Sequence, residues 1–271
     1  MAAAFVLALR EGTEAVLILT FVLGLLKKSG RLELRRHAWT GTAVAALVAL
    51  AAALVLTWLG TEFEGSGEII FEGTSMFLAG SFLIWMVFWV RRQSVPVTSS
   101  LAAKIGRLPE GNVAVSIFAV TFFAVLREGL EFALFMVALG SAAQNGSLLA
   151  GALAGMVFAA LLGFLLYTSV LKINMRQFFR ITNILLMFFA AGLLAGSARE
   201  FADLGLIPVI IPKIYDISSI LNTTNFAGGM LRSLFGYNPA PSLIEILVYL
   251  FTLGFILLSM RKPMRQVRVE S

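Results

Sequence analysis

The chain lacks cysteine altogether, has a single histidine and carries few charged residues. The absence of cysteine from all 271 residues excludes thiolate metal sites, iron–sulfur clusters and disulfides. With His37 as the only histidine, a multi-histidine metal site is excluded as well. Charged residues make up 13% of the chain and hydrophobic residues 59%, whereas a soluble domain is roughly 25% charged. The composition therefore indicates an integral membrane protein.

Seven apolar stretches are long enough to cross the roughly 30 Å hydrocarbon core of a bilayer as helices. They predict an all-α integral membrane protein with seven transmembrane helices in a single domain over residues 1–271. An outer segment, residues 199–241, lies between the last two stretches, and residues 261–271 form a short tail. The seven stretches are 3–26, 38–60, 69–90, 113–140, 148–171, 178–198 and 242–260.

Basic residues gather in alternate loops and in the C-terminal tail. The positive-inside rule places these segments in the cytoplasm. It predicts a multi-pass protein of a plasma or inner cell membrane, with the N-terminus outside and the C-terminus inside. The net charge of +6 follows from this topology, so we expect membrane lipid around the chain and no nucleic-acid partner. The basic residues are Lys27, Lys28, Arg31, Arg35, Arg36, Arg91, Arg92, Lys104, Arg107, Lys172, Arg176, Arg180, Arg261, Lys262, Arg265 and Arg268.

A five-residue phrase occurs twice inside the apolar stretches. Each copy places one arginine and two glutamates at a depth where every ionisable group costs about 2.5–3.5 kcal/mol. We therefore expect these groups to be functional, although a buried salt bridge that fixes helix packing is the alternative for each copy. The copies are Arg10-Glu11-Gly12-Thr13-Glu14 and Arg127-Glu128-Gly129-Leu130-Glu131.

The two copies head two similar units, residues 1–92 and 113–198. Gly41 begins a Gly/Ala-rich second span, as Gly151 begins the fifth. Because each unit has three spans, the second unit must enter the membrane from the opposite side. This predicts a 3+3 inverted-topology repeat plus one C-terminal helix, 242–260. Secondary transporters share this arrangement, with the substrate site at the midplane between the repeats.

Helical spacing predicts a carboxylate site. Residues three apart share a helix face, so Glu11 with Glu14, and Glu128 with Glu131, each form a carboxylate pair. Such oxygen ligands favour hard cations, including Mg²⁺, Ca²⁺, Mn²⁺ and iron.

The other motif residues are expected to support this site. Arg10 and Arg127 each precede a motif glutamate by four residues, which makes them charge partners. Gly12 and Gly129 lack side chains, and we expect the first and fourth spans to cross at them. Four carboxylates would then converge.

Acidic residues near the predicted outer ends of the third and sixth spans form a second candidate group. Glu68 and Glu72 enter the third span, and Glu200 and Asp203 follow the sixth. They could concentrate cations at an outer mouth; the alternative is a solvated acidic loop. The outer segment, broken by proline and glycine, is expected to cap the bundle or to dock a partner.

Nearly the whole chain resembles the oxidase-dependent iron permease family, which includes the fungal high-affinity iron permeases and bacterial counterparts. The resemblance implies iron uptake, with the four motif glutamates handling Fe²⁺ or Fe³⁺ as substrate and the motif arginines as their partners. It implies no bound organic cofactor, and it implies a periplasmic or extracellular protein that oxidises or delivers iron. The residues that carry it are both R-E-G-x-E motifs, Phe71-Glu72-Gly73, Tyr215 to Ser218, Leu234 to Asn238 and Pro241 to Glu245.

The chain departs from this family after the sixth span. Bacterial members often carry a His-Glu-x-x-Glu-like stretch there, whereas this chain has Arg199-Glu200-Phe201-Ala202-Asp203. An arginine thus replaces a candidate metal ligand at the outer end.

Two other functions fit parts of the pattern. One is transport of another hard divalent cation, such as manganese. The other is a membrane lipid-pyrophosphate phosphatase, which also pairs inverted repeats with intramembrane glutamates and an arginine. The chain has no Pro-Gly-x-Ser-Arg-type run to hold phosphates. We therefore expect a transporter, not an enzyme.

Overall fold

The computed structural model describes residues 1–92, 113–142, 147–168, 175–208, 210–223 and 225–261, and every regular element in these ranges is helical. The basic residues Lys104, Arg107 and Lys172, and the predicted tail beyond Arg261, lie outside the described residues. The elements are α1 (Ala2–Lys28), η1 (Leu32–Leu34), α2 (Arg35–Glu62), α3 (Ser66–Arg92), α5 (Val113–Ala142), α6 (Ser147–Tyr167), α7 (Met175–Asp203), α8 (Phe226–Phe235) and α9 (Leu243–Arg261).

Each of the seven predicted stretches coincides with a helix. Among the described residues, six helices are long and apolar enough to cross a bilayer, namely α2, α3, α5, α6, α7 and α9. The seventh, α1, is 27 residues long and carries the first charged motif, so its crossing stays a prediction. The stretch 148–171 runs beyond the end of α6 at Tyr167 into residues that are not described.

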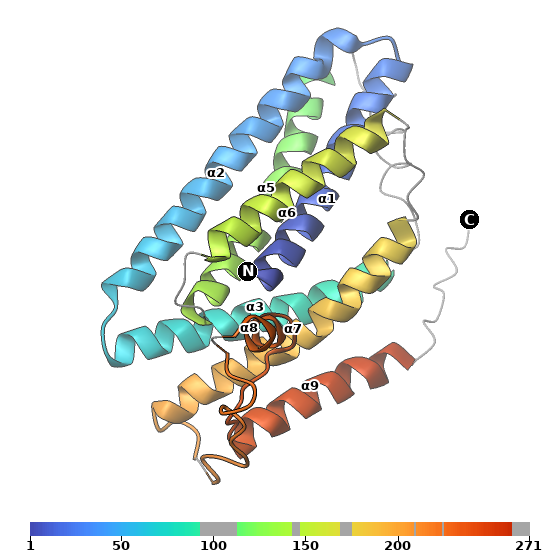
Figure 1. Ribbon diagram of the computed structural model, residues 1–271. Helices are drawn as coiled ribbons and strands as arrows, with labels where there is room; N and C mark the ends of the chain where they lie inside the picture. Colours follow the sequence, from blue (N-terminus) through green and yellow to red (C-terminus); the bar gives the residue numbers. More distant parts are fainter. Residues whose placement is uncertain (93–112, 143–146, 169–174, 209, 224, 262–271) are drawn as a thin grey trace, which may run out of the picture.

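The long helices form two groups (Figure 1). In one group α1, α2, α5 and α6 run side by side, and in the other α3 and α7 cross below them with α9 against α7. Leu7 of α1, Leu83 of α3 and Phe135 of α5 are buried in a core between the groups. By contrast, Leu54 of α2 and Phe251 of α9 face outward. The exposed leucines and phenylalanines are what lipid would cover.

The first helix of each half runs parallel to the second helix of the other half. On α6, Gly155 lies against Phe5, and eight residues later Gly163 lies against Val16 of α1. The contacts advance in the same direction along both helices, so α1 and α6 are parallel.

The same relation joins α2 and α5. Gly41 of α2 lies against Phe118, and Ala49 lies against Gly129. Because only a short connection containing η1 joins α1 to α2, these two helices are antiparallel. It follows that α1 and α5, which carry the two motifs, run in opposite directions.

The third helices of the two halves, α3 and α7, are antiparallel. Gly73 lies against Phe201, and Gly80, further along α3, lies against Leu194, which is earlier on α7. The Ser197 hydroxyl donates a 2.8 Å hydrogen bond to the Gly73 carbonyl oxygen and so joins the start of α3 to the end of α7.

The outer segment packs over the bundle. It contains a helix, α8, that the sequence did not predict and that contacts α7 and α1. The helix ends at Gly236, whose positive φ of 65° suits glycine. Gly236 also lies directly against Gly192 of α7, an approach that a side chain at either position would block.

Candidate functional site

The two charged motifs meet inside the bundle, each near the middle of its helix. Glu11 of α1 and both Glu128 and Glu131 of α5 are buried. One carboxylate oxygen of each lies within 4.8 Å of the others. We call these three residues the three-carboxylate group; α1 supplies one member and α5 supplies two.

The arginine of α1 is completely enclosed, with 0% of its side chain exposed. Its Nη1 lies 2.6 Å from Glu11 Oε1 and its Nη2 lies 2.7 Å from Glu14 Oε1. Nη1 also donates to the Met86 sulfur of α3 at 3.0 Å. Arg10 therefore holds both carboxylates of its own motif and joins them to a neighbouring helix.

Glu14 is the one motif glutamate outside the three-carboxylate group. Its side chain is 17% exposed and points to Arg10. The structure thus brings together three of the four glutamates that the spacing grouped.

The arginine of α5 has a different environment. The Arg127 side chain is 35% exposed, and its Nε lies 2.8 Å from Glu131 Oε1. Among the ion pairs of the described residues, none includes Glu128. Glu128 is therefore a buried carboxylate without a direct cationic partner in the part of the chain that is described.

One oxygen of each member, Oε2 of Glu11, Glu128 and Glu131, is buried and has no hydrogen-bond partner among the described residues. Leaving a buried carboxylate oxygen unpaired is costly. A hard cation between the three carboxylates would supply the missing partner, since carboxylate oxygens are ligands that such ions prefer. Four ionised motif glutamates and two arginines would leave a local charge of −2.

The motif glycines do not join α1 to α5, so the predicted crossing is corrected. A Cβ on Gly12 would lie 2.7 Å from the Ala159 Cβ of α6, and one on Gly129 would lie 2.5 Å from the Ala49 Cβ of α2. Each glycine therefore packs against the second helix of the opposite half.

The correction has a geometric reason. Successive residues of an α-helix point about 100° apart. Gly12 therefore points about 100° away from Glu11 and about 160° away from Glu14. A helix that turns its carboxylates toward α5 must turn its glycine toward another neighbour.

A stripe of small residues at a spacing of four was the signal for these contacts. On α2 it comprises Gly41, Ala45 and Ala49, and on α6 it comprises Gly151, Gly155 and Ala159. Small residues at this spacing let helix backbones approach closely in membranes. Met86, by contrast, had no sequence signal as a partner of Arg10.

The structure places the outer-mouth candidates close together, at the start of α3 and the end of α7. Arg199 Nη2 lies 2.8 Å from Glu200 Oε1. Glu72 interacts electrostatically with Glu200, Glu68 and Arg199. Asp203 is exposed at the end of α7. Glu72, Glu200 and Asp203 therefore interact with one arginine, Arg199, whereas Glu68 interacts with Glu72.

A carboxylate that the sequence did not single out also reaches this arginine. Glu245 of α9 is buried and lies 3.9 Å from Arg199 Nη1. It follows a proline-rich turn near the start of its helix, a position that predicts helix capping and nothing more specific.

Residues 1–265 match the Iron permease FTR1 family. The chain is 34% identical to the ferrous iron permease EfeU of Shigella sonnei (strain Ss046) and to that of Escherichia coli O157:H7, in each case over 263 residues, 96% of this chain and 95% of the relative. It is also 34% identical to ferrous iron permease EfeU of Yersinia pestis over 247 residues, 90% of this chain and 88% of the relative. No solved structure gives a significant match.

Proposed function

This chain belongs to the iron permease FTR1 family, and on that premise we propose that it imports iron through the three-carboxylate group. Its family and its relatives are permeases, so the protein is a permease and not an enzyme. Six apolar helices together with the family make it a multi-pass membrane protein.

The observation that carries the proposed site is the convergence of Glu11, Glu128 and Glu131. Their carboxylates come from two helices that are far apart in sequence, and each has a buried oxygen with no hydrogen-bond partner among the residues that the structure describes. Packing alone would be satisfied by arginine–glutamate pairs and would not require a third carboxylate without a cation.

The helix directions support two inverted halves, residues 1–92 and 113–198, within a seven-span protein. The motif helices α1 and α5 run oppositely, and so do α3 and α7. The close packing of α1 with α6 and of α2 with α5 makes two helix pairs, each drawn from both halves. The three-carboxylate group lies at the interface between the pairs. Movement of one pair against the other would open it to each side in turn.

The charge of the motif residues favours a divalent ion. With all four glutamates ionised, Arg10 and Arg127 reduce the local charge to −2, which Fe²⁺ would neutralise. The relatives are named ferrous iron permeases. The proposal includes placement in a plasma or inner membrane with the N-terminus outside, and an outer partner that delivers or oxidises iron, as the family resemblance implies.

Uptake of radioactive iron into liposomes containing the purified chain tests the proposal. The triple variant E11Q/E128Q/E131Q should abolish uptake, because glutamine keeps the shape but removes the charge. E64Q, in an exposed loop, serves as the matched control. Uptake at the wild-type rate in the triple variant would refute the site.

Two further arms of the same assay identify the ion. Iron held reduced should enter faster than ferric iron presented as a soluble chelate. Manganese in excess should compete only weakly. Faster entry of manganese than of iron would replace the proposal with the manganese alternative.

A further inference from the structure

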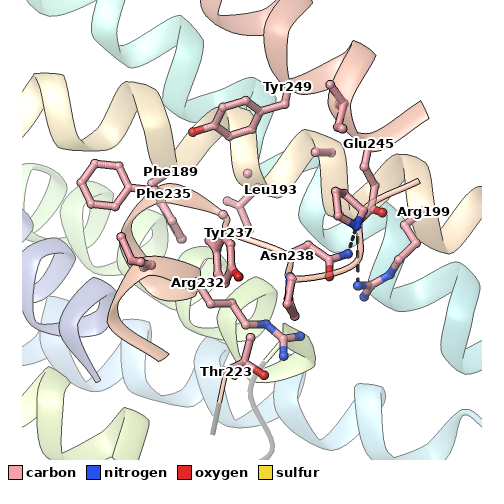
Figure 2. A pocket seen from close by; sticks show the side chains of 18 of the residues that line it. Phe189, Leu193, Arg199, Thr223, Arg232, Phe235, Tyr237, Asn238, Glu245 and Tyr249 are labelled. Carbon is pink, nitrogen blue, oxygen red and sulfur yellow. Dashed lines mark hydrogen bonds and ion pairs between the residues drawn. The ribbon is translucent and has the colours of Figure 1, made fainter. Parts of the chain in front are cut away.

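A cavity of about 560 Å³ lies between α7, α8, α9 and the loop that connects the last two helices (Figure 2). Cavities of roughly 300–1,000 Å³ commonly bind small molecules. None of the motif glutamates lines it, so it is distinct from the three-carboxylate group.

One side of the cavity is polar. Figure 2 shows the guanidinium groups of Arg199 and Arg232 on this side, with Asn238 and Glu245 close to Arg199. Glu245 already accepts hydrogen bonds from Asn238 Nδ2 at 2.9 Å and from the Ser242 backbone N–H at 2.8 Å. Its charge is thus shared between these donors and Arg199.

Arg232 is the cation of this wall that lacks a counter-ion. Across the described residues, no carboxylate lies within 4 Å of its guanidinium. Partial burial, and after it the nearby Arg199, lower the pKa of the Arg232 guanidinium, while Glu245 raises it; the residue as a whole stays exposed. Because Arg199 already contacts Glu200 at 2.8 Å and lies 3.9 Å from Glu245, Arg232 is the positive charge of this wall that an anion would pair.

Much of the remaining lining of the cavity is apolar. Phe189 and Leu193 of α7, Leu231 of α8 and Leu250 of α9 line it, and it reaches Met76 of the buried core. Leu250 is also 60% exposed on the outside of α9, a surface that lipid would cover. The apolar end therefore borders the hydrocarbon region, whereas the arginines lie beside the outer segment.

We propose that this cavity binds an anionic phospholipid, with the headgroup phosphate between Arg199 and Arg232 and an acyl chain against Phe189, Leu193 and Leu250. Arginine binds phosphate through charge-assisted hydrogen bonds, because its planar guanidinium group can donate two of them side by side. The apolar wall accepts a chain, which a free phosphate lacks. A bound lipid would hold α8 against α7 and α9.

Equilibrium binding of a short-chain fluorescent phosphatidylglycerol to the purified full chain in neutral detergent tests this proposal. R232Q should weaken binding by roughly 10-fold or more, the effect of losing a hydrogen bond between charged groups. R180Q changes an exposed arginine at the other end of α7 and should bind like the wild type. Equal binding by R232Q and the wild type would overturn the proposal.

Two further arms keep the proposal falsifiable if R232Q folds poorly. L250W fills the apolar side from an exposed position and leaves both arginines in place, and it should also weaken lipid binding by about 10-fold. Inorganic phosphate should compete only at concentrations at least 100-fold higher than the lipid, because it lacks the chain. Unchanged binding by L250W, or phosphate and lipid competing equally, would reject the lipid as the ligand.

Discussion

The two copies of the R-E-G-x-E motif have the same spacing but different surroundings. Arg10 is fully enclosed and holds both glutamates of its motif, whereas Arg127 is 35% exposed and contacts Glu131. The difference leaves Glu128 as the carboxylate without a direct arginine contact in the described chain. A repeated sequence thus produces two glutamates that share one arginine on α1, whereas on α5 one glutamate contacts its arginine and the other does not.

The two halves also differ in which of their glutamates meet. Under exact twofold symmetry Glu14 would have the position of Glu131, yet Glu131 belongs to the three-carboxylate group and Glu14 does not. Both glutamates contact the arginine of their own motif, Glu14 at 2.7 Å and Glu131 at 2.8 Å, so the arginine contacts alone do not explain this difference. The two halves therefore differ most at the site itself.

The largest expected effect is on the iron uptake rate, and it distinguishes Glu128 from Glu14. E128Q should reduce the initial rate of iron uptake by about 100-fold, because it removes a charged member of the three-carboxylate group. Among the described residues Glu128 contacts no arginine, so the variant breaks no ion pair. E14Q should reduce the rate by roughly 10-fold or less, through a changed position of Arg10. Radioactive iron uptake in liposomes measures both. Equal loss in the two variants would show that Glu14 is as much a ligand as Glu128.

The second prediction compares how much each motif arginine contributes to the free energy of unfolding. R10Q leaves two carboxylates without their enclosed partner and should lower the free energy of unfolding by about 3–5 kcal/mol. R127Q removes a partly exposed partner and should cost about 1 kcal/mol or less. Unfolding of the purified variants in detergent, followed by circular dichroism, compares them. A larger loss of unfolding free energy for R127Q than for R10Q would contradict the conclusion that Arg10 is the more deeply buried of the two arginines.

The third effect concerns a feature in which the halves agree. G12A and G129A each place a methyl group against an alanine methyl of the opposite half, and each should cost about 1–3 kcal/mol. A159G should rescue G12A, and A49G should rescue G129A. The exchanged combinations, G12A with A49G and G129A with A159G, are the controls and should not recover stability. Rescue by an exchanged partner would contradict the packing of α1 on α6 and α2 on α5.

The smallest effect concerns a charge difference between the third helices of the two halves: Glu72 lies near the predicted outer end of α3, whereas Arg180 lies near the predicted inner end of α7. E68Q/E72Q should raise the KM for iron about twofold at low ionic strength and less in high salt, because exposed charges act over a screened distance. Uptake rates across a salt series measure this. A twofold effect that persists at high salt would point to direct ligation instead of attraction.

Much of the fold could be predicted from the sequence, because a bilayer constrains length and polarity so strongly. The span at 242–260 coincides with α9, Leu243–Arg261, almost to the residue. α8 could not be predicted, because its ten residues contain two glycines and its stability depends on contacts with α7 and α1. The direction of each helix contact also depends on tertiary packing.

The candidate site could be predicted in its residues but not in its arrangement. The spacing of Glu128 and Glu131 places both on one face of α5, and both belong to the three-carboxylate group. The rotation of α1 about its axis was not predicted, because it is set by Gly12 against Ala159. The exclusion of Glu14 likewise depends on how the helices pack against one another, which local spacing does not determine.

The central claim is that the two motifs build one shared iron site, and equilibrium binding of radioactive ferrous iron to the purified chain tests it most directly. The wild-type chain should bind one iron ion at the site. The single variants E11Q and E128Q, one from each motif, should each lower the affinity by about 10–100-fold. A variant of one motif that leaves binding by the other motif intact, with two separable iron sites in the wild type, would contradict the account.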